Sequence, residues 1–342
     1  MILGIESTAH TFGIGIVENG KILANVKDSY TTEKGGIIPI DAAKHHREVC
    51  DSVLNLALEK AQVKLKDINA IAFSQGPGLA PCLLVGINFA KKIARKLKIP
   101  LVSVNHCVAH LEIGKLTGAK DPVLLYASGA NTQIIAYAGG KYRVFGETLD
   151  IGVGNFIDTF ARHAGLGFPG GPKIAKIVSE AKNPHYIELP YSIKGMDVSF
   201  SGIQTKLKQM LDSNKYSLED LSFSLQETAF AMLVEASERA LAHINKNELV
   251  LGGGVACNTR LQEMCKIMCE ERGAKFFVPA NEFLLDNGGM ISFLGEIILK
   301  NQRFLGHKIS GKSNVFKAGT KAFDKLDIAP RQRTDDINVS WR

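Results

Sequence analysis

A pattern of three short apolar segments separated by polar turns occurs twice in this sequence of 342 residues. The first copy reads MILGIESTAHTFGIGIVENGKILANVKDS and contains Asn19-Gly20, a dipeptide that strongly favours a hairpin turn. The second copy begins near residue 122 and reads PVLLYASGANTQIIAYAGGKYRVFGETLD. Segments with helical spacing and further apolar segments follow each copy. The repetition predicts an α/β protein made of two related halves.

The chain is also long enough for two lobes, because a single hydrophobic core stops growing at about 250 to 300 residues. We expect an N-terminal lobe at 1–121 and a C-terminal lobe at 122–302. A long helical and looping segment at about 151–245 would be an insertion that elaborates the second lobe. Residues 303–342 are basic and weakly periodic, and we expect them to form a tail.

Composition excludes several classes of protein. Apolar residues make up 45% and charged residues 22% of the chain, as in ordinary globular proteins rather than disordered ones. Every apolar run is interrupted before the ~20 residues that a membrane-spanning helix needs. The six cysteines include no CxxC pair and no secretory leader is visible, which favours a cytoplasmic location. The net charge of +7 favours polyanionic partners, although an ordinary basic surface explains it equally well.

The segment VNHCVAHLE is the first candidate for a chemical site. It places His106 and His110 four residues apart, so that a helix would present both imidazoles on one face, as a metal site requires. Two histidines without a metal are also compatible with this spacing. A zinc protease helix needs glutamate directly after the first histidine, and Cys107 occupies that position. A third, oxygen ligand could come from Asp286 in LLDNGGM.

Three polar segments at the ends of predicted strands favour nucleotide binding. The turns at 6–11 and 128–132 could direct backbone N–H groups toward a phosphate. In LVLGGGVACNTRL, glycines follow a buried strand and either Asn258 or Thr259 caps a helix whose N-terminus attracts anions. Each segment alone is equally well explained as an ordinary turn. The three together, in this order, indicate a nucleotide site.

The segment GLGFPG formally matches the GxGxxG motif of dinucleotide-binding proteins. It follows no predicted strand, and Pro169 stands where that motif should begin its helix, so we reject a Rossmann fold. The overlapping segment FPGGPK is better explained as a loop whose backbone lies against a ligand at Gly171.

Nine ordered motifs, spread from Met1 to the terminal RTDDINVSW, give the chain a resemblance to a known family. They are GIESTAHTFGIGI, SQGPG, VNHCVAHLE, YASGANTQ, FPGGPK, KGMDVSFSG, QETAF, GGGVACNTRL and DNGGM. The chain resembles the tRNA threonylcarbamoyladenosine transferases, and within them the archaeal and eukaryotic KEOPS branch. The resemblance implies the actin-like ATPase (ASKHA) fold, with two RNase H-like lobes around a nucleotide cleft.

The resemblance also implies site residues. One iron or zinc ion would be bound by His106, His110, Tyr126 and Asp286. His10 stands where the bacterial branch has an aspartate, and it is our candidate for a catalytic base. The positions that match nucleotide contacts of the family are Tyr126, Ala127, Ser128, Gly129, Ala130, Asn131, Asp158, Gly171 and Asn258. Ala175 departs from the pattern, since relatives often have an acidic residue there, which puts one ribose contact in doubt.

The implied reaction is transfer of the threonylcarbamoyl group from threonylcarbamoyl-AMP to the N6 amine of a tRNA adenosine, with release of AMP. That adenosine lies 3′ of the anticodon in tRNAs that read codons beginning with adenine. The cleft would therefore bind an adenine nucleotide, either threonylcarbamoyl-AMP or ATP. Implied partners are tRNA and the other KEOPS subunits, including a small atypical kinase/ATPase that can be fused to this chain in a longer protein. The basic run at 91–98 could contact tRNA phosphates or form a solvated helix face.

Three alternatives to the transferase are compatible with parts of the sequence. An actin-like ATPase or small-molecule kinase would use the same fold without needing the histidines. A metalloprotease rests on the HxxxH spacing alone, and Cys107 disfavours it. A nucleotide-dependent scaffold is possible because a fold can support binding without chemistry.

Overall fold

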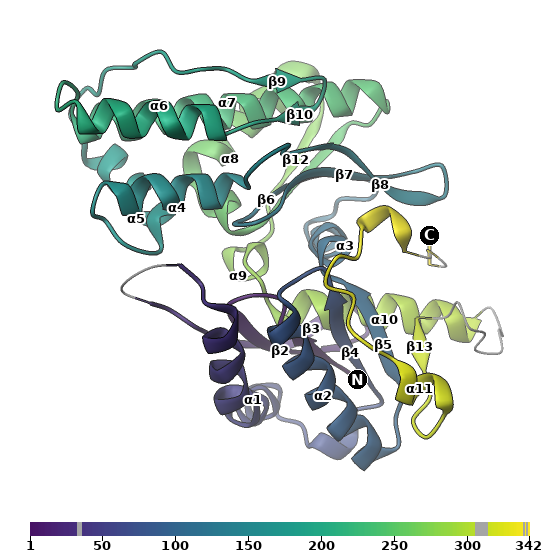
Figure 1. Cartoon of the computed structure of the whole chain (residues 1–342). Coiled ribbons are helices and arrows are strands. Elements are labelled where there is room, and N and C mark those ends of the chain that lie inside the picture. The colour runs from purple at the N-terminus through teal and green to yellow at the C-terminus, as the bar shows by residue number, and fades with distance from the viewer. Residues whose placement is uncertain (33–35, 305–313, 338, 340) are drawn as a thin grey trace.

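The computed structural model describes residues 1–32, 36–304, 314–337, 339 and 341–342 (Figure 1). It contains two mixed sheets, one in each lobe, and helices cover both of them. The N-terminus and the first five strands lie in the lower lobe of Figure 1, and strands β6 to β8 lie in the upper lobe.

The sheet of the lower lobe has the strand order β13-β5-β4-β1-β2-β3. Strands β1, β2 and β3 form an antiparallel meander, whereas β4 and β5 run parallel to β1. The hairpin predicted at Asn19-Gly20 joins β2 to β3, and both residues have a positive φ. The bounds are β1 (Ile2–Glu6), β2 (Thr11–Glu18), β3 (Lys21–Ser29), β4 (Ala70–Gly76), β5 (Leu101–Asn105) and β13 (Val315–Phe316).

The sheet of the upper lobe repeats this arrangement. Its strand order is β12-β11-β6-β7-β8, with an antiparallel meander of β6, β7 and β8 and with β11 and β12 parallel to β6. The predicted duplication is therefore confirmed at the level of topology. The bounds are β6 (Val123–Ala127), β7 (Thr132–Ala138), β8 (Lys141–Glu147), β11 (Glu248–Gly252) and β12 (Lys275–Phe277).

Helices cover both faces of the first sheet. Helices α1 and α2 pack on one face and α10 packs on the other, where it contacts β1, β2 and β4. Apolar side chains at helical spacing explain the packing of α2, whose Leu83, Ile87 and Ile93 are buried. The bounds are α1 (Pro39–Ala61), η1 (Leu65–Asp67), α2 (Ala80–Leu97) and α10 (Gly288–Phe304).

The helices of the second lobe belong mostly to the segment that we predicted as an insertion. They surround one hydrophobic core in which Phe156 and Phe200 stack at 5.4 Å between ring centroids. The bounds are α4 (Val153–His163), α5 (Gly170–Glu180), β9 (Ile193–Lys194), β10 (Asp197–Val198), α6 (Ser201–Asp212), α7 (Leu218–His243), η3 (Gly254–Cys257) and α8 (Thr259–Arg272). Three short elements lie near the junction of the lobes: α3 (His106–Glu112), η2 (Ile113–Thr117) and α9 (Asn281–Leu284).

Helix α10 lies within the range 122–302 that we assigned to the second lobe, yet it packs on the first sheet. Glycines on the strands make this approach possible, because they let the backbone of the helix reach the backbone of the sheet. A Cβ atom on Gly15 would lie 2.3 Å from the backbone of Gly288, and one on Gly4 would lie 2.2 Å from the nitrogen of Ser292. A lobe boundary at residue 302 therefore does not follow the packing.

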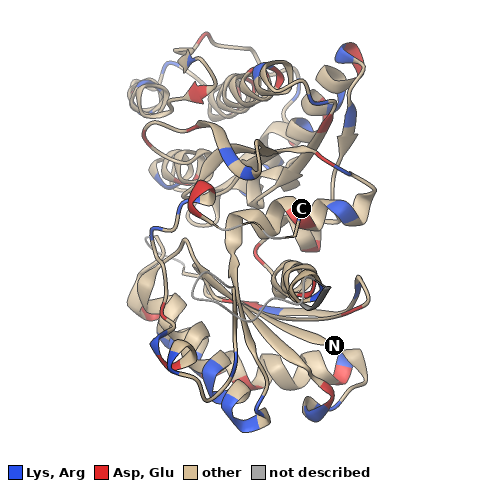
Figure 2. Ribbon diagram, turned by 90° about the vertical axis from the view of Figure 1, so that its right-hand side faces the viewer, with Lys and Arg blue, Asp and Glu red and all other residues tan. Residues whose placement is uncertain are grey.

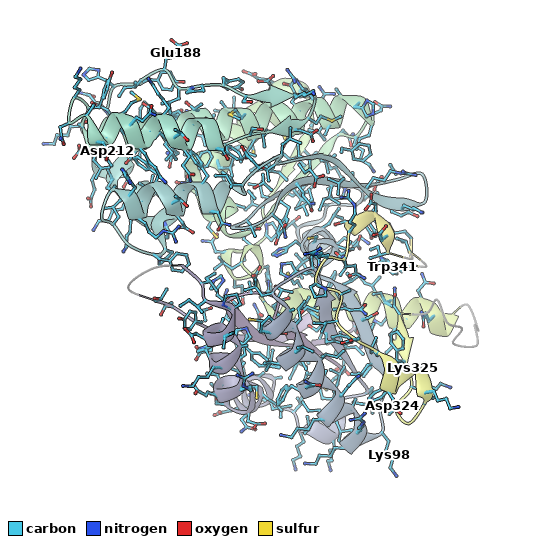
Figure 3. All side chains as sticks on the ribbon, viewed as in Figure 1. Lys98, Glu188, Asp212, Asp324, Lys325 and Trp341 are labelled. Atoms are coloured by element: carbon cyan, nitrogen blue, oxygen red, sulfur yellow. The ribbon has the colours of Figure 1, made fainter. Side chains whose placement is uncertain are left out.

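The tail crosses from one lobe to the other, as the yellow segment of Figure 1 shows. Residues 305–313 of the predicted tail lie outside the described part of the chain. Beyond them come β13, α11 (Lys321–Lys325) and η4 (Thr334–Asp336). Trp341, labelled in Figure 3, then donates from Nε1 to the Tyr142 hydroxyl of β8 at 3.1 Å.

The tail engages part of the basic run at 91–98. The Lys91 ammonium donates to the carbonyl oxygens of Asp324 and Leu326, and Arg95 pairs with the Asp324 carboxylate at 3.0 Å. These two cations stabilise the docked tail, which reduces the part of the run that could contact tRNA.

Figure 2 shows lysines and arginines distributed over both lobes and interspersed with acidic residues. No helix within the described ranges is both long enough and apolar enough to cross a bilayer, in agreement with the sequence.

Candidate metal centre

Helix α3 begins where β5 ends and brings both histidines of VNHCVAHLE into the interior. The side chain of Asn105 caps the helix by accepting from the backbone N–H of Val108 at 3.1 Å. All seven residues of α3 are buried. The rings of His106 and His110 lie 4.8 Å apart between centroids, which is the shared helix face that the spacing predicted.

Two further side chains meet these histidines. Oδ1 of Asp286, from the loop between α9 and α10, lies 3.3 Å from Nε2 of His106 and 3.4 Å from Nε2 of His110. The Tyr126 hydroxyl, at the end of β6, lies 3.0 Å from Nε2 of His106. The ligand atoms of the two histidines and the aspartate all lie within 4.8 Å of one another. The structure thus brings together the four residues that the family resemblance implied.

A buried carboxylate orients the first histidine from behind. Oε2 of Glu6 lies 3.0 Å from Nδ1 of His106, which leaves Nε2 free to face the cluster. The other oxygen of Glu6 accepts from the backbone N–H of Thr8 at 2.6 Å. A carboxylate behind a ligating histidine is the usual outer shell of a metal site. This role of Glu6 was not predicted from the sequence, where Glu6 was assigned to a turn that binds phosphate. A charged residue at the end of a buried strand could have indicated it.

The charge balance of the cluster fits a bound cation. Burial alone would raise the pKa of Asp286, but the two histidines beside it hold that pKa well below its ordinary value. Burial lowers the pKa of His110, and this favours the neutral imidazole that ligates metals. Burial opposes protonation of His106, yet its interactions with Tyr126, Glu6 and Asp286 raise its pKa well above the ordinary value. Positive charge, from a proton or from a metal ion, is therefore favoured here. Two imidazoles, one carboxylate and one phenol are donors that suit zinc or iron.

Two of the three predicted nucleotide segments, the turn at 128–132 and the glycine segment before Asn258, lie together at the ends of β6 and β11, whereas the turn at 6–11 follows β1 of the other sheet. The turn after β6 is closed by the Ser128 backbone N–H, which donates to the Asn131 carbonyl at 3.0 Å. Gly253 packs against this turn with a φ of 92°, and a Cβ there would lie 2.3 Å from the Ala127 carbonyl oxygen. The positions Ala127, Ser128, Gly129, Ala130 and Asn131 thus sit beside the loop that leads to Asn258.

Asn258, rather than Thr259, caps α8. Its Oδ1 accepts from the Arg260 backbone N–H at 2.9 Å, and its amide donates to Gln226 at 2.9 Å. The side chain therefore holds the helix N-terminus in place, and a ligand there would meet backbone N–H groups.

Asp158 of α4 contacts the segment FPGGPK, which was predicted as a loop but whose last four residues form the first turn of α5, with Pro169 as the N-cap. Oδ1 of Asp158 accepts from the Gly170 backbone N–H at 2.7 Å. Burial raises the pKa of Asp158, and the N–H groups of Gly170 and Gly171 oppose this, as do the charges of Arg162 and His10. His10 belongs to the turn after β1 in the other lobe. The space around Gly171 is open, since a Cβ atom there would meet no atom of the described residues within 4 Å.

Ala175, where the family resemblance implied an acidic residue in relatives, is a half-buried residue of α5.

One lysine that was not singled out from the sequence also reaches the centre. Lys27 of β3 directs its ammonium to the Asp286 carbonyl oxygen at 3.5 Å. Burial lowers the pKa of Lys27, and Asp286, Cys257 and Glu282 oppose that shift.

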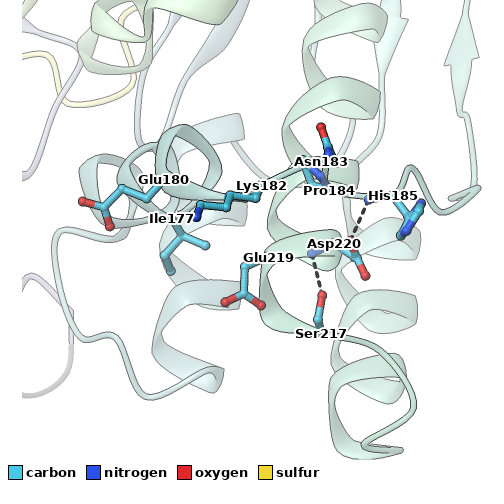
Figure 4. A pocket seen from close by; sticks show the side chains of 10 residues that line it. Ile177, Glu180, Lys182, Asn183, Pro184, His185, Ser217, Glu219 and Asp220 are labelled. Carbon is cyan, nitrogen blue, oxygen red and sulfur yellow. Dashed lines mark hydrogen bonds between the residues drawn. The ribbon is translucent and has the colours of Figure 1, made fainter.

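A surface pocket of about 490 Å³ lies between the end of α5 and the start of α7 (Figure 4). Lys182, Asn183 and Asp220 are among its lining residues. None of the candidate site residues lines it, so the pocket is separate from the metal centre.

The two lobes contain sheets with the same strand order, and a His-His-Asp cluster lies near their junction. These features define an actin-like α/β protein with a candidate metal centre. The activator of a 2-hydroxyisocaproyl-CoA dehydratase from Clostridium difficile, solved with ADPNP, matches 91% of this chain and 99% of its own at a TM-score of 0.55 and 12% identity. HypF from T. kodakarensis matches 87% of this chain and 47% of its own at a TM-score of 0.59 and 14% identity. These likenesses confirm the predicted ASKHA fold.

The sequence comparisons give the family. The model of the tRNA N6-adenosine threonylcarbamoyltransferases matches residues 21–293. Enzymes of that name from Thermococcus sibiricus and Archaeoglobus fulgidus are 53% and 48% identical to this chain, and each alignment covers 99% of both proteins. The chain belongs to this family and is an enzyme of that class. Of the alternatives, the kinase, the protease and the scaffold receive no support from these matches.

A longer relative from Methanosarcina acetivorans is 50% identical over 344 residues. It is described as a probable bifunctional tRNA threonylcarbamoyladenosine biosynthesis protein, and the match covers 99% of this chain but 59% of that protein. Relatives of this chain thus occur as one part of a larger polypeptide.

Proposed function

We propose that this chain transfers the threonylcarbamoyl group from threonylcarbamoyl-AMP to the N6 amine of the adenosine 3′ of the anticodon. The single observation that supports this best is the convergence of His106, His110, Tyr126 and Asp286 beside the loop that leads to Asn258. A Cβ atom on Gly252, where that loop begins, would lie 3.4 Å from the Cβ of His110. A metal centre beside a candidate nucleotide site is what an acyl-adenylate requires, since the reacting carbonyl is joined to the nucleotide phosphate.

In this proposal the four converging side chains hold one iron or zinc ion. A bound ion would polarise the donor carbonyl or hold the threonyl carboxylate. Glu6 keeps the His106 ring oriented through Nδ1. The adenylate occupies the site formed by the turn at 128–131, the N-terminus of α8 and the first turn of α5 at Gly171, where backbone N–H groups favour anionic oxygen.

The reaction forms a bond between the adenosine N6 nitrogen and the carbamoyl carbon and breaks the bond from that carbon to the phosphate oxygen. AMP leaves with the bonding electron pair, and the N6 nitrogen gives up one proton. His10 is our candidate for the group that accepts this proton, because it is an imidazole whose charge acts on Asp158 of the candidate nucleotide site. The target adenosine must leave the stack of its loop to reach the site.

We also propose that the chain acts with other KEOPS subunits, including the small kinase-like ATPase. The existence of bifunctional relatives supports a partner encoded with this chain. The net charge of +7 is modest, and Lys91 and Arg95 of the basic run contact the tail. Because few cations are left to contact phosphates, we propose that other subunits contribute to tRNA binding. The isolated chain should therefore bind labelled tRNA more weakly than the assembled complex at matched salt. Equal binding and turnover would contradict partner dependence.

The central test combines metal analysis with mass spectrometry of tRNA nucleosides after incubation with synthetic threonylcarbamoyl-AMP. The wild-type protein should contain about one metal ion and produce the modified adenosine with its partners present. Asp286→Ala should lose metal and activity together, because the carboxylate supplies both charge and geometry. The matched control is Asp51→Ala, since Asp51 is 71% exposed on α1 and distant from the cluster. Full metal content in Asp286→Ala would remove that residue from the ligand set, and a metal-loaded wild type without product would contradict the function.

A further inference from the structure

Lys27 lies on β3 and points toward the loop that precedes α10. It pairs across the sheet with Gly13, and a Cβ on Gly13 would lie 2.9 Å from the backbone nitrogen of Gly288. Side chains of directly paired residues share one face of a sheet, so Lys27 projects toward the start of α10. Its contact with the Asp286 carbonyl agrees with this direction.

The second lobe approaches the same point. Gly253, just before η3, donates from its backbone N–H to the Leu284 carbonyl oxygen at 2.9 Å, two residues before Asp286. In agreement, the charge of Lys27 opposes the rise in the pKa of Cys257 that burial causes. The next residue, Asn258, caps α8. Lys27 is therefore placed between the loop of the metal centre, on one side, and the candidate nucleotide helix, on the other.

The ammonium of Lys27 has little compensation inside the protein. Within the described residues it has one hydrogen bond, at 3.5 Å, and no carboxylate oxygen within 4.0 Å. The Asp286 carboxylate is directed at the two histidines, and the Glu282 carboxylate accepts from Asn25 at 3.1 Å. A half-buried cation with unused donors can bind an anion from outside the chain, because buried charges are normally paired.

We infer that Lys27 binds an anionic oxygen of the acyl-adenylate, on its phosphate or on its threonyl carboxylate, at the junction of the two lobes. The inference rests on the proposed function, which supplies both anions. The acids Glu6, Asp286 and Glu282 lie close by, so a substrate with two negative groups needs a fixed positive charge to enter.

The test compares ligand binding by Lys27→Met and by the wild type. Methionine keeps most of the length of the side chain and removes the charge and the donors. A charge-assisted hydrogen bond contributes about 1.5 to 3 kcal/mol, so we expect affinity to fall about 10- to 100-fold. Lys27→Arg should stay close to wild type. Lys21→Met is the matched control, because Lys21 is an exposed lysine of the same strand.

Three probes separate the two anions. If Lys27 binds the phosphate, Lys27→Met weakens AMP and leaves adenosine unchanged. If it binds the carboxylate, AMP is unchanged and only threonylcarbamoyl-AMP binds more weakly. Unchanged affinity for both AMP and threonylcarbamoyl-AMP, in a variant with wild-type metal content and melting temperature, overturns the inference. A wild-type protein that binds neither AMP nor threonylcarbamoyl-AMP also overturns the inference. A wild type that binds the acyl-adenylate but modifies no tRNA contradicts the proposed function and leaves the Lys27 comparison valid.

Discussion

Replacing Arg342 with methionine should weaken the attachment of the tail to α3, the helix that carries both histidines. The Arg342 guanidinium donates to Glu112 Oε1 at 2.6 and 3.0 Å and to the Tyr142 hydroxyl at 3.1 Å. The Glu112 side chain is fully buried, and its pKa is lowered by Arg342 and Lys115 although burial alone would raise it. Loss of Arg342 would leave this carboxylate with less compensation, and its surroundings would then favour the protonated form.

The size of the effect follows from these contacts. Removal of one partner of a buried ion pair costs about 3 to 5 kcal/mol. Lys115 and Tyr142 still contact Glu112 in the variant, so the lower end of that range applies. The second contact of Arg342, to Asp121 at 2.9 Å, involves a half-exposed carboxylate and adds less than about 1 kcal/mol. We expect Arg342→Met to lower the free energy of unfolding by about 3 kcal/mol.

Urea unfolding, with hydrogen exchange of the α3 amides as a local probe, measures this cost. Arg333→Met is the matched control, because Arg333 is a half-exposed arginine of the same tail whose Asp335 partner is also partly exposed. In a Glu112→Gln background, Arg342→Met should cost about 1 kcal/mol or less, since no buried charge remains to be left unpaired. A cost below about 1 kcal/mol in the wild-type background, or the same cost in both backgrounds, would refute this reasoning.

Three other perturbations test the site and its surroundings. Glu6→Gln should weaken metal binding about 10- to 100-fold by loosening His106, as measured by competition with a chelator, whereas Glu282→Gln should not. Asn258→Ala should weaken AMP binding and leave metal content unchanged, and a parallel loss of metal would indicate misfolding instead. Burial, with the neighbouring His45, lowers the pKa of His46 to about 4, so the unfolded chain binds a proton that the folded chain does not. Stability should therefore fall by up to about 3 kcal/mol between pH 6.5 and 4, and His46→Gln should flatten this slope in urea titrations if the reasoning holds.

The topology and the clustering of the candidate metal ligands were predictable for different reasons. The duplicated meander was visible because strand period and turn residues are local properties of the sequence. The pair of His106 and His110 was visible because helical spacing fixes their shared face. Spacing could not supply Tyr126 and could offer Asp286 only as a candidate, since both lie far away in sequence. The family motifs identified these two residues.

Two features, the packing of α10 and the position of Lys27, could not be predicted from the sequence because they depend on contacts between residues far apart in the chain. The packing of helix α10 on the first sheet was not predicted, because it depends on strand glycines such as Gly4 and Gly15, nearly the whole chain away. Alternate glycines in a buried strand signal a close backbone approach, but they do not say which helix approaches. Lys27 was missed for a similar reason, since its neighbour Asp286 is 259 residues distant and β3 alone shows only an ordinary half-exposed strand.

The origin of the ligands indicates how the centre depends on the two lobes. His106 and His110 lie on α3, which follows a strand of the first sheet, and Asp286 precedes α10, which packs both on that sheet and on α3. These three residues are therefore held by one packed unit. Tyr126 lies on β6 of the second sheet, and only Ala127 separates it from the turn of the candidate nucleotide site. A change in the angle between the lobes would move the tyrosine and that turn together relative to the other three candidate ligands. In the proposed function, an adenylate bound at that turn would be coupled to the candidate metal centre through Tyr126, because a ligand that holds the second lobe in place would also set the distance of the Tyr126 hydroxyl from His106.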